Sequence, residues 1–346
     1  MKQQQATTQI NVNLKGERHF MLRSMYSGIS GLKNFQTKLD VIGNNIANVN
    51  TYGFKKERTI FKDLISQTQA GASGPSATRG GVNAMQVGLG SQLAAIDTMH
   101  TPGSMQSTGR TLDLAISGDG FFMVADSVDF QPGEVDELGV ATGLTNTLYT
   151  RAGNFGMDSN GYLVNSDGKY LVGFANANIG EYDAIDDPEG WVSNFDEEKG
   201  DTVDGVEAGT NILEEGALPD GAQPIRIPVT GKDITIGQDG TISFVDSAGK
   251  LQYAGTIILA KFPNASGLTK QGGNYFQDTQ NSGAAYAQFG TVDGLGSINS
   301  SFLEMSNVDL SEEFTEMIVA QRGFQSNSRI ITTSDEILQE LVNLKR

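Results

Sequence analysis

Apolar residues near the start of the chain recur at steps of three and four positions, which is typical of one face of a helix. The stripe consists of Leu22, Met25, Ile29, Leu32, Phe35, Leu39, Ile42, Ile46 and Val49. Its narrow width is that of a coiled-coil seam rather than of a broad core face. The spacing predicts a helix of about 29 residues, ~44 Å long at about 1.5 Å per residue, which is long for a small globular domain.

A second stripe follows Asp309 and runs to the C-terminus. Its apolar members have a heptad spacing and are Phe314, Met317, Phe324, Ile331, Leu338 and Val342. Polar residues share the same face at Gln321, Ser328 and Asp335. Ser311 is the predicted N-cap of this helix, with Glu312 and Glu313 in the first turn, where the helix dipole favours acidic groups.

The two predicted helices carry opposite net charge. Residues 21–62 contain seven basic and two acidic side chains, whereas residues 311–346 contain four basic and six acidic ones. Opposite charge favours side-by-side packing, although an exposed ion pair contributes only ~0–1 kcal/mol. Either stripe alone is also typical of an ordinary core helix, but two terminal helices that flank a β-rich middle favour pairing with each other.

Between the helices the pattern changes to that of β-structure. Residues 56–108 are rich in Gly, Ser, Thr and Gln, which predicts an extended connecting region with short strands. Strand patterns begin near residue 109, and Gly118-Asp119-Gly120 is interpreted as a hairpin turn. Residues 157–174 and 236–257 each combine two turns with short strands and predict further hairpins. The predicted fold class is α+β: long N- and C-terminal helices pair as a helical hairpin or coiled coil, with a mainly β middle region of one or two outer domains.

The predicted organisation has five parts. Residues 21–55 and 305–346 form a helical inner-core domain, 56–108 the connecting region, and 109–180 with 222–304 a β-rich outer domain. Residues 181–221 are an acidic insertion, in which 181–220 hold fourteen acidic residues and one lysine; it is either a solvated segment or a small outer domain. Residues 1–20 are predicted to be a non-native or disordered extension, because their last codons would resemble a ribosome-binding site ahead of Met21.

Composition limits the chemistry of the chain. Its 346 residues carry a net charge of -17, which disfavours a nucleic-acid surface. Cysteine is absent, which excludes disulfides, and two histidines, His19 and His100, are little material for a metal site or a catalytic triad. No segment approaches the roughly 20 apolar residues of a membrane span. His100 is interpreted as a loop residue, and no catalytic, cofactor-binding or metal-binding residue is predicted.

Four segments resemble the bacterial flagellar axial proteins, the family of rod and hook subunits. They are SGISGLKNFQTKLDVIGNNIANVNTYGFK at 27–55, GRTLDLAISGDGFFMV at 109–124, LYTRAGNFGMDSNGYLVNSDG at 148–168, and the run that begins FLEMSNVDLSEEF at 302 and ends at 345. Within the family the resemblance is nearest to the hook subunits of Gram-positive bacilli, with the distal rod subunit as the alternative. The resemblance implies a structural subunit that self-assembles into a hollow flexible tube and couples the motor rod to the filament.

The resemblance also implies a location and partners. The chain would lie in the flagellar hook or basal body, outside the cell after type III export, with no cofactor, nucleic acid or membrane insertion. Its partners would be copies of itself, the rod, hook-cap and hook–filament junction proteins, and the export apparatus. Phe61 and Ile65 lie in a segment that resembles the Phe-x-x-x-hydrophobic element of early export substrates, although plain packing is a simpler interpretation.

The helical stripes and the amides near the end of the first helix are predicted to contact other subunits. The candidate assembly residues are Leu32, Leu39, Ile42, Asn44, Asn45, Ile46, Asn48, Asn50, Gly53, Phe54, Phe314, Met317, Gln321, Phe324, Ile331 and Leu338. Two helices cannot bury all of their faces, and amides held between neighbours would fix the register of packing. An adhesin carried by the β region is an alternative of a different class, and an enzyme is the least favoured interpretation.

Overall fold

The computed structural model describes residues 2–76, 78–127, 144–175, 222–247 and 249–343, and these form an α+β fold. They divide into two compact units. The helical unit contains Met1–Ala47, Lys56–Met99 and Val308–Arg346, and the β unit contains Asn48–Lys55 and His100–Asn307. The acidic insertion predicted at 181–221 lies outside the described residues.

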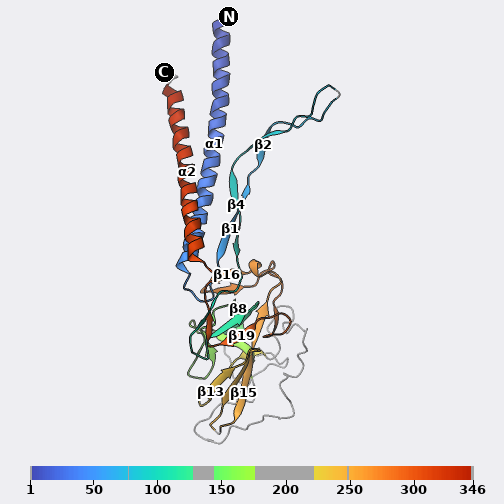
Figure 1. The fold of residues 1–346 in the computed structure, drawn as a ribbon, viewed down its shortest axis with the longest axis vertical. Coiled ribbons are helices and arrows are strands. Elements are labelled where there is room, and N and C mark those ends of the chain that lie inside the picture. The colour runs from blue at the N-terminus through green and yellow to red at the C-terminus, as the bar shows by residue number, and fades with distance from the viewer. Residues whose placement is uncertain (1, 77, 128–143, 176–221, 248, 344–346) are drawn as a thin grey trace. The chain divides into compact units, whose positions relative to one another are not determined.

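Two long antiparallel helices, α1 (Lys2–Ala47) and α2 (Leu310–Asn343), lie side by side in the helical unit (Figure 1). Gly28 approaches Ile331, Phe35 lies against Gly323, and Lys38 forms an ion pair with Glu316. The predicted helices are therefore present. In the structure α1 already begins at Lys2, and a translation start at Met21 stays a prediction.

The N-cap of α2 lies two residues before the one that the sequence pattern predicted. Asp309 is the cap: its Oδ1 accepts hydrogen bonds from the backbone N–H of Ser311 at 2.8 Å and of Glu312 at 3.4 Å. Its backbone oxygen accepts from the N–H of Glu313 at 3.0 Å. The predicted cap Ser311 is wrong because Asp309 already satisfies the N–H groups that a cap must satisfy.

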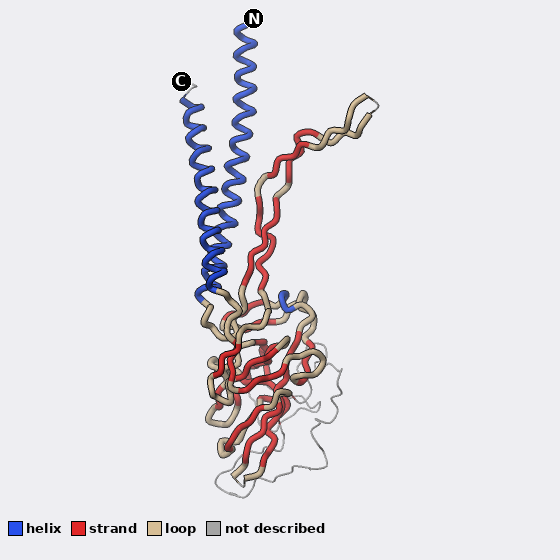
Figure 2. The backbone as a smooth tube through the Cα atoms, viewed as in Figure 1, coloured by secondary structure: helices blue, strands red, loops and turns tan. Residues whose placement is uncertain are grey.

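A long β-ribbon belongs to the same unit as the helices. Strand β1 (Glu57–Asp63) pairs antiparallel with β4 (Ser91–Thr98), and β2 (Ser66–Ala70) pairs with β3 (Met85–Gly88). Figure 2 draws these strands as the long red stretches of tube at the positions labelled β1, β2 and β4 in Figure 1. The side chain of Asn34 in α1 holds the first residue of β4, since Asn34 Nδ2 donates to Ser91 Oγ at 2.8 Å. The region predicted as one connecting segment, 56–108, is thus divided in the structure, with its first part in the helical unit and residues 100–108 in the β unit.

Among the described residues of the β unit, the largest sheet has twelve strands. Its main path runs β13 (Lys232–Ile236), β14 (Thr241–Val245), β15 (Leu251–Lys261), β11 (Tyr170–Ala175), β7 (Phe121–Ser127), β8 (Leu144–Thr150), β17 (Tyr275–Gln277) and β16 (Thr269–Gly272). The short strands β9 (Gly156–Met157), β10 (Leu163–Val164), β12 (Ala222–Pro224) and β18 (Tyr286–Phe289) pair onto this path. A 3-10 turn, Ala265–Gly267, precedes β16.

Both faces of this sheet are buried at its central strand β7. Along β7, Phe122 and Val124 belong to one buried cluster, whereas Phe121, Met123 and Ala125 belong to another. Successive strand side chains point to opposite faces, so this division is what two covered faces require. The nearly continuous apolar run of β7 is therefore explained by burial on both sides.

Two small pairings complete the β unit. Strand β6 (Leu114–Ser117) pairs with β19 (Ser297–Ser300), and β5 (Met105–Ser107) pairs with β20 (Phe302–Glu304). Both pairings join the segment near residue 110 to the segment near residue 300. The β5–β20 pairing joins two of the stretches through which the chain passes between this unit and the helical unit.

The predicted hairpins had mixed outcomes. The segments at 157–174 and 236–257 form the meanders β9–β10–β11 and β13–β14–β15, which confirms both. The hairpin at Gly118-Asp119-Gly120 is wrong, because β6 pairs with β19 while β7 pairs within the large sheet. The carbonyl groups of this turn bind other segments: Arg151 Nη2 donates to the Gly118 oxygen and the N–H of Gly296 donates to the Asp119 oxygen, both at 2.7 Å.

Candidate assembly site and its polar junctions

The contact between α1 and α2 depends on small residues. A Cβ at Gly323 would lie 2.6 Å from Phe35 Cζ, and a Cβ at Gly31 would lie 2.6 Å from Asn327 Nδ2. Real Cβ atoms do not approach other atoms this closely, so glycine allows each neighbouring side chain to lie against the opposite helix. Both glycines lie among residues of helical periodicity, but the spacing of apolar residues does not mark them as contact positions.

Much of the apolar surface of the helices remains exposed. Phe314 is 50% exposed, Phe324 36%, Ile318 54% and Val319 57% on α2, and Tyr26 is 66% exposed on α1. Asn44, Asn50 and Gln321 are also exposed, whereas Leu32, Leu39, Ile46, Asn48, Met317, Ile331 and Leu338 are half-buried. Tyr26 in α1 and Ile318 and Val319 in α2 do not belong to the predicted stripes, because they fall outside the three-and-four spacing of the other apolar residues.

Four of the candidate assembly residues are buried within single units of the chain. Ile42 is 4% exposed and Asn45 1% in the helical unit, and Phe54 is 7% exposed in the β unit, where Gly53 is buried as well. The N–H of Gly53 donates to the backbone oxygen of Glu304 at 2.9 Å. The φ of Gly53 is 71°, which lies in the left-handed region that favours glycine. The predicted turn out of the helix at Gly53 thus has a local conformational basis.

Asn45 joins three segments of the helical unit at the end of α1. Its Nδ2 donates to the Glu57 backbone oxygen at 2.9 Å, and its Oδ1 accepts from the Glu57 N–H at 3.0 Å. The amide therefore pairs with β1 as a neighbouring strand would. The same Nδ2 lies 3.2 Å from Glu313 Oε2 in the first turn of α2.

Glu313 is a buried carboxylate whose charge is balanced at this junction. The residue is 2% exposed, and its Oε1 lies 2.9 Å from Lys56 Nζ, which also contacts Glu312 Oε2 at 2.9 Å. Burial lowers the pKa of Lys56, but the hydrogen bonds to Glu312 and Glu313 outweigh it and raise the pKa overall. Lys56 is therefore charged across the physiological range, as a buried glutamate partner requires.

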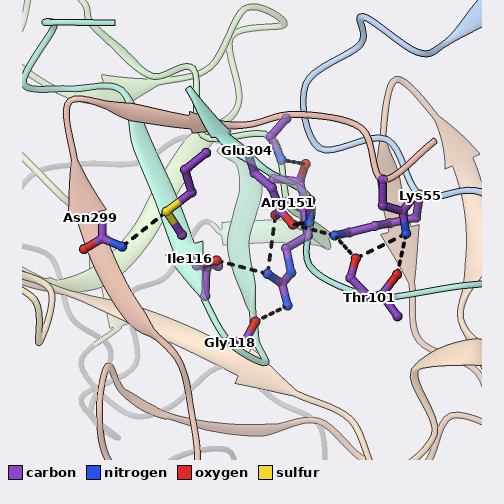
Figure 3. Close-up of polar contacts among 12 residues, drawn as sticks. Lys55, Thr101, Ile116, Gly118, Arg151, Asn299 and Glu304 are labelled. Atoms are coloured by element: carbon purple, nitrogen blue, oxygen red, sulfur yellow. Dashed lines mark hydrogen bonds and ion pairs between the residues drawn. The ribbon is translucent and has the colours of Figure 1, made fainter. Parts of the chain in front are cut away.

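The β unit contains a second junction, centred on Glu304 (Figure 3). Glu304 Oε1 accepts from Lys55 Nζ at 2.6 Å, and Oε2 lies 3.4 Å from Arg151 Nη1. All three residues are almost fully buried, at 1% exposure for Lys55 and Glu304 and 2% for Arg151. Burial lowers the pKa of both cations, and Glu304 opposes this by stabilising their charged forms.

His100 lies in the loop after β4, and its half-buried side chain is close to the cations of this junction. Its ring packs edge-on against Phe121 at 5.5 Å and Phe276 at 5.2 Å between centroids. Burial, followed by the positive charges of Lys55, Arg151 and Lys270, lowers the pKa of His100 from 6.5 to about 4. The prediction that His100 is a loop residue is confirmed, but nothing in the local sequence indicated the aromatic and cationic neighbours of its half-buried ring.

Phe61 and Ile65, which resemble an export element, lie at the end of β1 and just after it. Ile65 is 81% exposed and Phe61 is half-buried. Their role in export stays a prediction.

Three family profiles match the chain. They are "Flagella basal body rod protein" at residues 25–55, "Flagellar hook protein FlgE/F/G D1 domain" at 138–244 and "Flagellar basal body rod FlgEFG protein C-terminal" at 299–344. The flagellar basal-body rod protein FlgG of Bacillus subtilis is 50% identical over 327 residues, which cover 94% of this chain and 100% of that protein. The chain belongs to the flagellar rod and hook protein family. It is therefore a component of the bacterial flagellum, as the resemblance of its motifs implied.

Two further members of the rod and hook family, from one organism, also match along their whole length. The flagellar hook protein FlgE of Borreliella burgdorferi is 34% identical over 458 aligned residues, and FlgG of the same organism is 33% identical over 329. Each alignment covers 94% of this chain and 100% of the relative. A crystal structure of Helicobacter pylori flagellar hook protein FlgE2 aligns with 40% of this chain and 26% of that chain, with 16% identity and a TM-score of 0.17, which is too low to support an argument.

These matches are to structural flagellar proteins and indicate no catalytic family. Among the described residues, no group of three or more acidic, histidine or cysteine side chains could hold a metal ion. Within the same residues, neither helix has a segment long and apolar enough to cross a membrane.

Proposed function

We propose that this protein is a subunit of the distal rod of the flagellum. The observation that carries the proposal is the 50% identity to the rod protein FlgG of Bacillus subtilis along that protein's whole length. The hook is the second candidate and was the preferred interpretation of the sequence. It is less well supported, since the hook protein FlgE of Borreliella burgdorferi is 34% identical.

Chain length supports the same choice. The alignment with FlgG of Bacillus subtilis needs 327 positions to cover 94% of this chain, whereas the alignment with FlgE of Borreliella burgdorferi needs 458 for the same share. The hook relative therefore contains long segments that have no counterpart here. The rod relative aligns with little inserted length.

Assembly into a polymer is proposed from the exposed apolar surface of the helices. Large apolar side chains such as Phe314, Ile318 and Val319 are about half exposed, and covering the exposed half would be favourable by about 1 kcal/mol each, since full burial of such a side chain is favourable by about 1.5–3 kcal/mol. A neighbouring copy of the same helix pair would cover them. The polar residues that share these faces, Gln321 and Asn44, would set the register between copies.

Within one subunit, α1 and α2 are proposed to pack as a coiled coil. The antiparallel contacts from Gly28 and Ile331 to Lys38 and Glu316, together with the three-and-four spacing of apolar residues, support this geometry. Side chains such as Phe35, which lies against Gly323, would act as knobs in the facing helix.

The further partners in this proposal are the other rod proteins, the hook and its cap and junction proteins, and the type III export apparatus that would deliver the chain. The exposed Ile65 and the half-buried Phe61 are the proposed contact with the export gate.

Immunogold electron microscopy of purified hook–basal bodies tests the location of the subunit. Antibodies raised against the acidic segment 181–220 are expected to label the straight shaft below the hook. Gold along the curved hook would replace the rod proposal with the hook, and gold over the general cell surface would favour an adhesin instead.

A further inference from the structure

We propose that Glu304 closes a clamp that makes three segments of the β unit open and close as one element. The Glu304 clamp consists of Lys55, Gly103, Arg151 and Glu304. The three segments are 48–55, 100–107 and 302–307, which are the parts of the β unit through which the chain passes covalently to and from the helical unit.

One carboxylate contacts two of these segments and the residue that directly follows strand β8 of the large sheet. Glu304 Oε1 accepts from Lys55 Nζ at 2.6 Å and from the Gly103 N–H at 2.8 Å. Glu304 Oε2 accepts from Arg151 Nη1 at 3.4 Å, and the same guanidinium donates to the Gly118 oxygen at 2.7 Å (Figure 3). Arg151 directly follows β8, so the clamp is anchored to the large sheet.

Backbone contacts hold the same three segments together. The Gly53 N–H donates to the backbone oxygen of Glu304 at 2.9 Å, and the Met305 N–H donates to the backbone oxygen of Ser104 at 2.8 Å. Lys55 Nζ donates to the Thr101 oxygen at 2.9 Å. A Cβ at Gly103 would lie 2.0 Å from the Met305 oxygen, so the second and third segments lie in direct backbone contact.

Burial of the charges makes these contacts depend on one another. Replacing a buried ion pair by apolar residues of similar size is often harmless, but removing one partner leaves an uncompensated charge and is strongly destabilising. If segment 302–307 moved away, Lys55 and Arg151 would be left as two like charges in a buried site. A displacement of one segment therefore favours displacement of the others, and cooperative local opening follows.

The clamp has a mechanical consequence that rests on the proposed function. In a polymer that transmits torque, covalent load reaches the β unit only through these segments. Without the clamp, each segment would detach from the rest of the β unit separately under load. With the clamp, the three segments must detach together.

Hydrogen exchange of the full chain, read by mass spectrometry, tests the clamp. Glu304→Gln keeps the shape of the side chain but removes its charge. Amide protection in 48–55, 100–107 and 302–307 is expected to fall together by about 100-fold or more, while the amides of β14 and β15 keep theirs. A loss confined to 302–307, or an equal loss in β14 and β15, would overturn the proposal.

A second variant keeps the test decisive if Glu304→Gln does not fold. This triple variant replaces all three buried charges by apolar side chains: Lys55→Met, Arg151→Met and Glu304→Leu. Replacing a whole buried ion-pair network in this way is often tolerated. The variant is expected to keep its melting temperature but to lose the common exchange rate of the three segments. A retained common rate would show that the charges do not couple them.

The matched control is Ile257→Val in the buried core of the same unit. It is expected to lower protection across the large sheet without separating the three segments from one another. These measurements concern the β unit of the free chain, so their failure leaves the rod proposal untouched, and the immunogold result leaves the clamp untouched.

Discussion

The packing of α1 against α2 can be tested by adding one methyl group to Gly323. In the structure, an added Cβ would lie 2.6 Å from Phe35 Cζ, 2.7 Å from Cε1 and 2.9 Å from Cε2. The whole edge of the aromatic ring would have to move. The control is Gly43→Ala in α1, where a Cβ meets no atom within 4 Å.

The expected magnitude combines two opposing effects. Alanine favours a helix over glycine by about 1 kcal/mol in an exposed interior position. Forcing an extra carbon into a packed contact costs about 1–3 kcal/mol. Gly43→Ala is therefore expected to stabilise the helical unit by up to about 1 kcal/mol, whereas Gly323→Ala is neutral or destabilises it by up to about 2 kcal/mol.

The assay is urea unfolding followed by helical circular dichroism at one fixed protein concentration. The midpoint for Gly323→Ala should lie below that for Gly43→Ala at unchanged slope. Equal midpoints for the two variants would refute the contact between Phe35 and Gly323, because helix propensity alone predicts the same gain in stability for both substitutions.

Three further substitutions test the junctions. Asn45→Ala leaves the Glu57 N–H and backbone oxygen without their partner and should lower the free energy of unfolding in urea by about 2–4 kcal/mol. The control Asn50→Ala, at an exposed position, should change that free energy by no more than about 0.5 kcal/mol. A small effect for both would argue against the Asn45 junction. Because the pKa of His100 is about 4 in the fold and 6.5 when unfolded, the fold loses up to about 3 kcal/mol as the pH falls from 6.5 to 4. His100→Gln should reduce that loss of unfolding free energy, and an unchanged pH profile would contradict the burial of a neutral imidazole. Gly53→Ala places a Cβ 2.6 Å from the Ala152 nitrogen and should lower the melting temperature more than Gly109→Ala, which has a similar φ of 73° but no atom within 4 Å.

Local patterns predicted the elements that have a regular period or a turn signal. The helices follow from the three-and-four spacing that includes Leu32 and Phe35, and the meanders follow from turns such as Asp158–Gly161 and Asp246–Gly249. The β1–β4 ribbon was predicted only as an extended region. Exposure alternates along β1, but Ile60 is 37% and Ile96 45% exposed, so the apolar pattern does not mark an inner face.

The polar junctions could not be predicted from local sequence, because their partners lie far apart in the chain. Lys55 and Glu304 are separated by 249 positions, and Asn45 and Glu313 by 268. The run of asparagines did single out Asn45, but as a contact between subunits. In the structure its amide is instead used within the subunit, which leaves the exposed Asn44 and Asn50 as the amides proposed for contacts between copies.

The two junctions share one arrangement of charges. Lys55 and Lys56 are consecutive, and the division between the two units falls between them. Lys55 pairs with buried Glu304 in the β unit, and Lys56 pairs with buried Glu313 in the helical unit. Each glutamate comes from the C-terminal part of the chain, so neither lysine has its carboxylate partner until that part has folded. Each unit therefore holds a lysine without its buried carboxylate partner until residues 304–313 are in place.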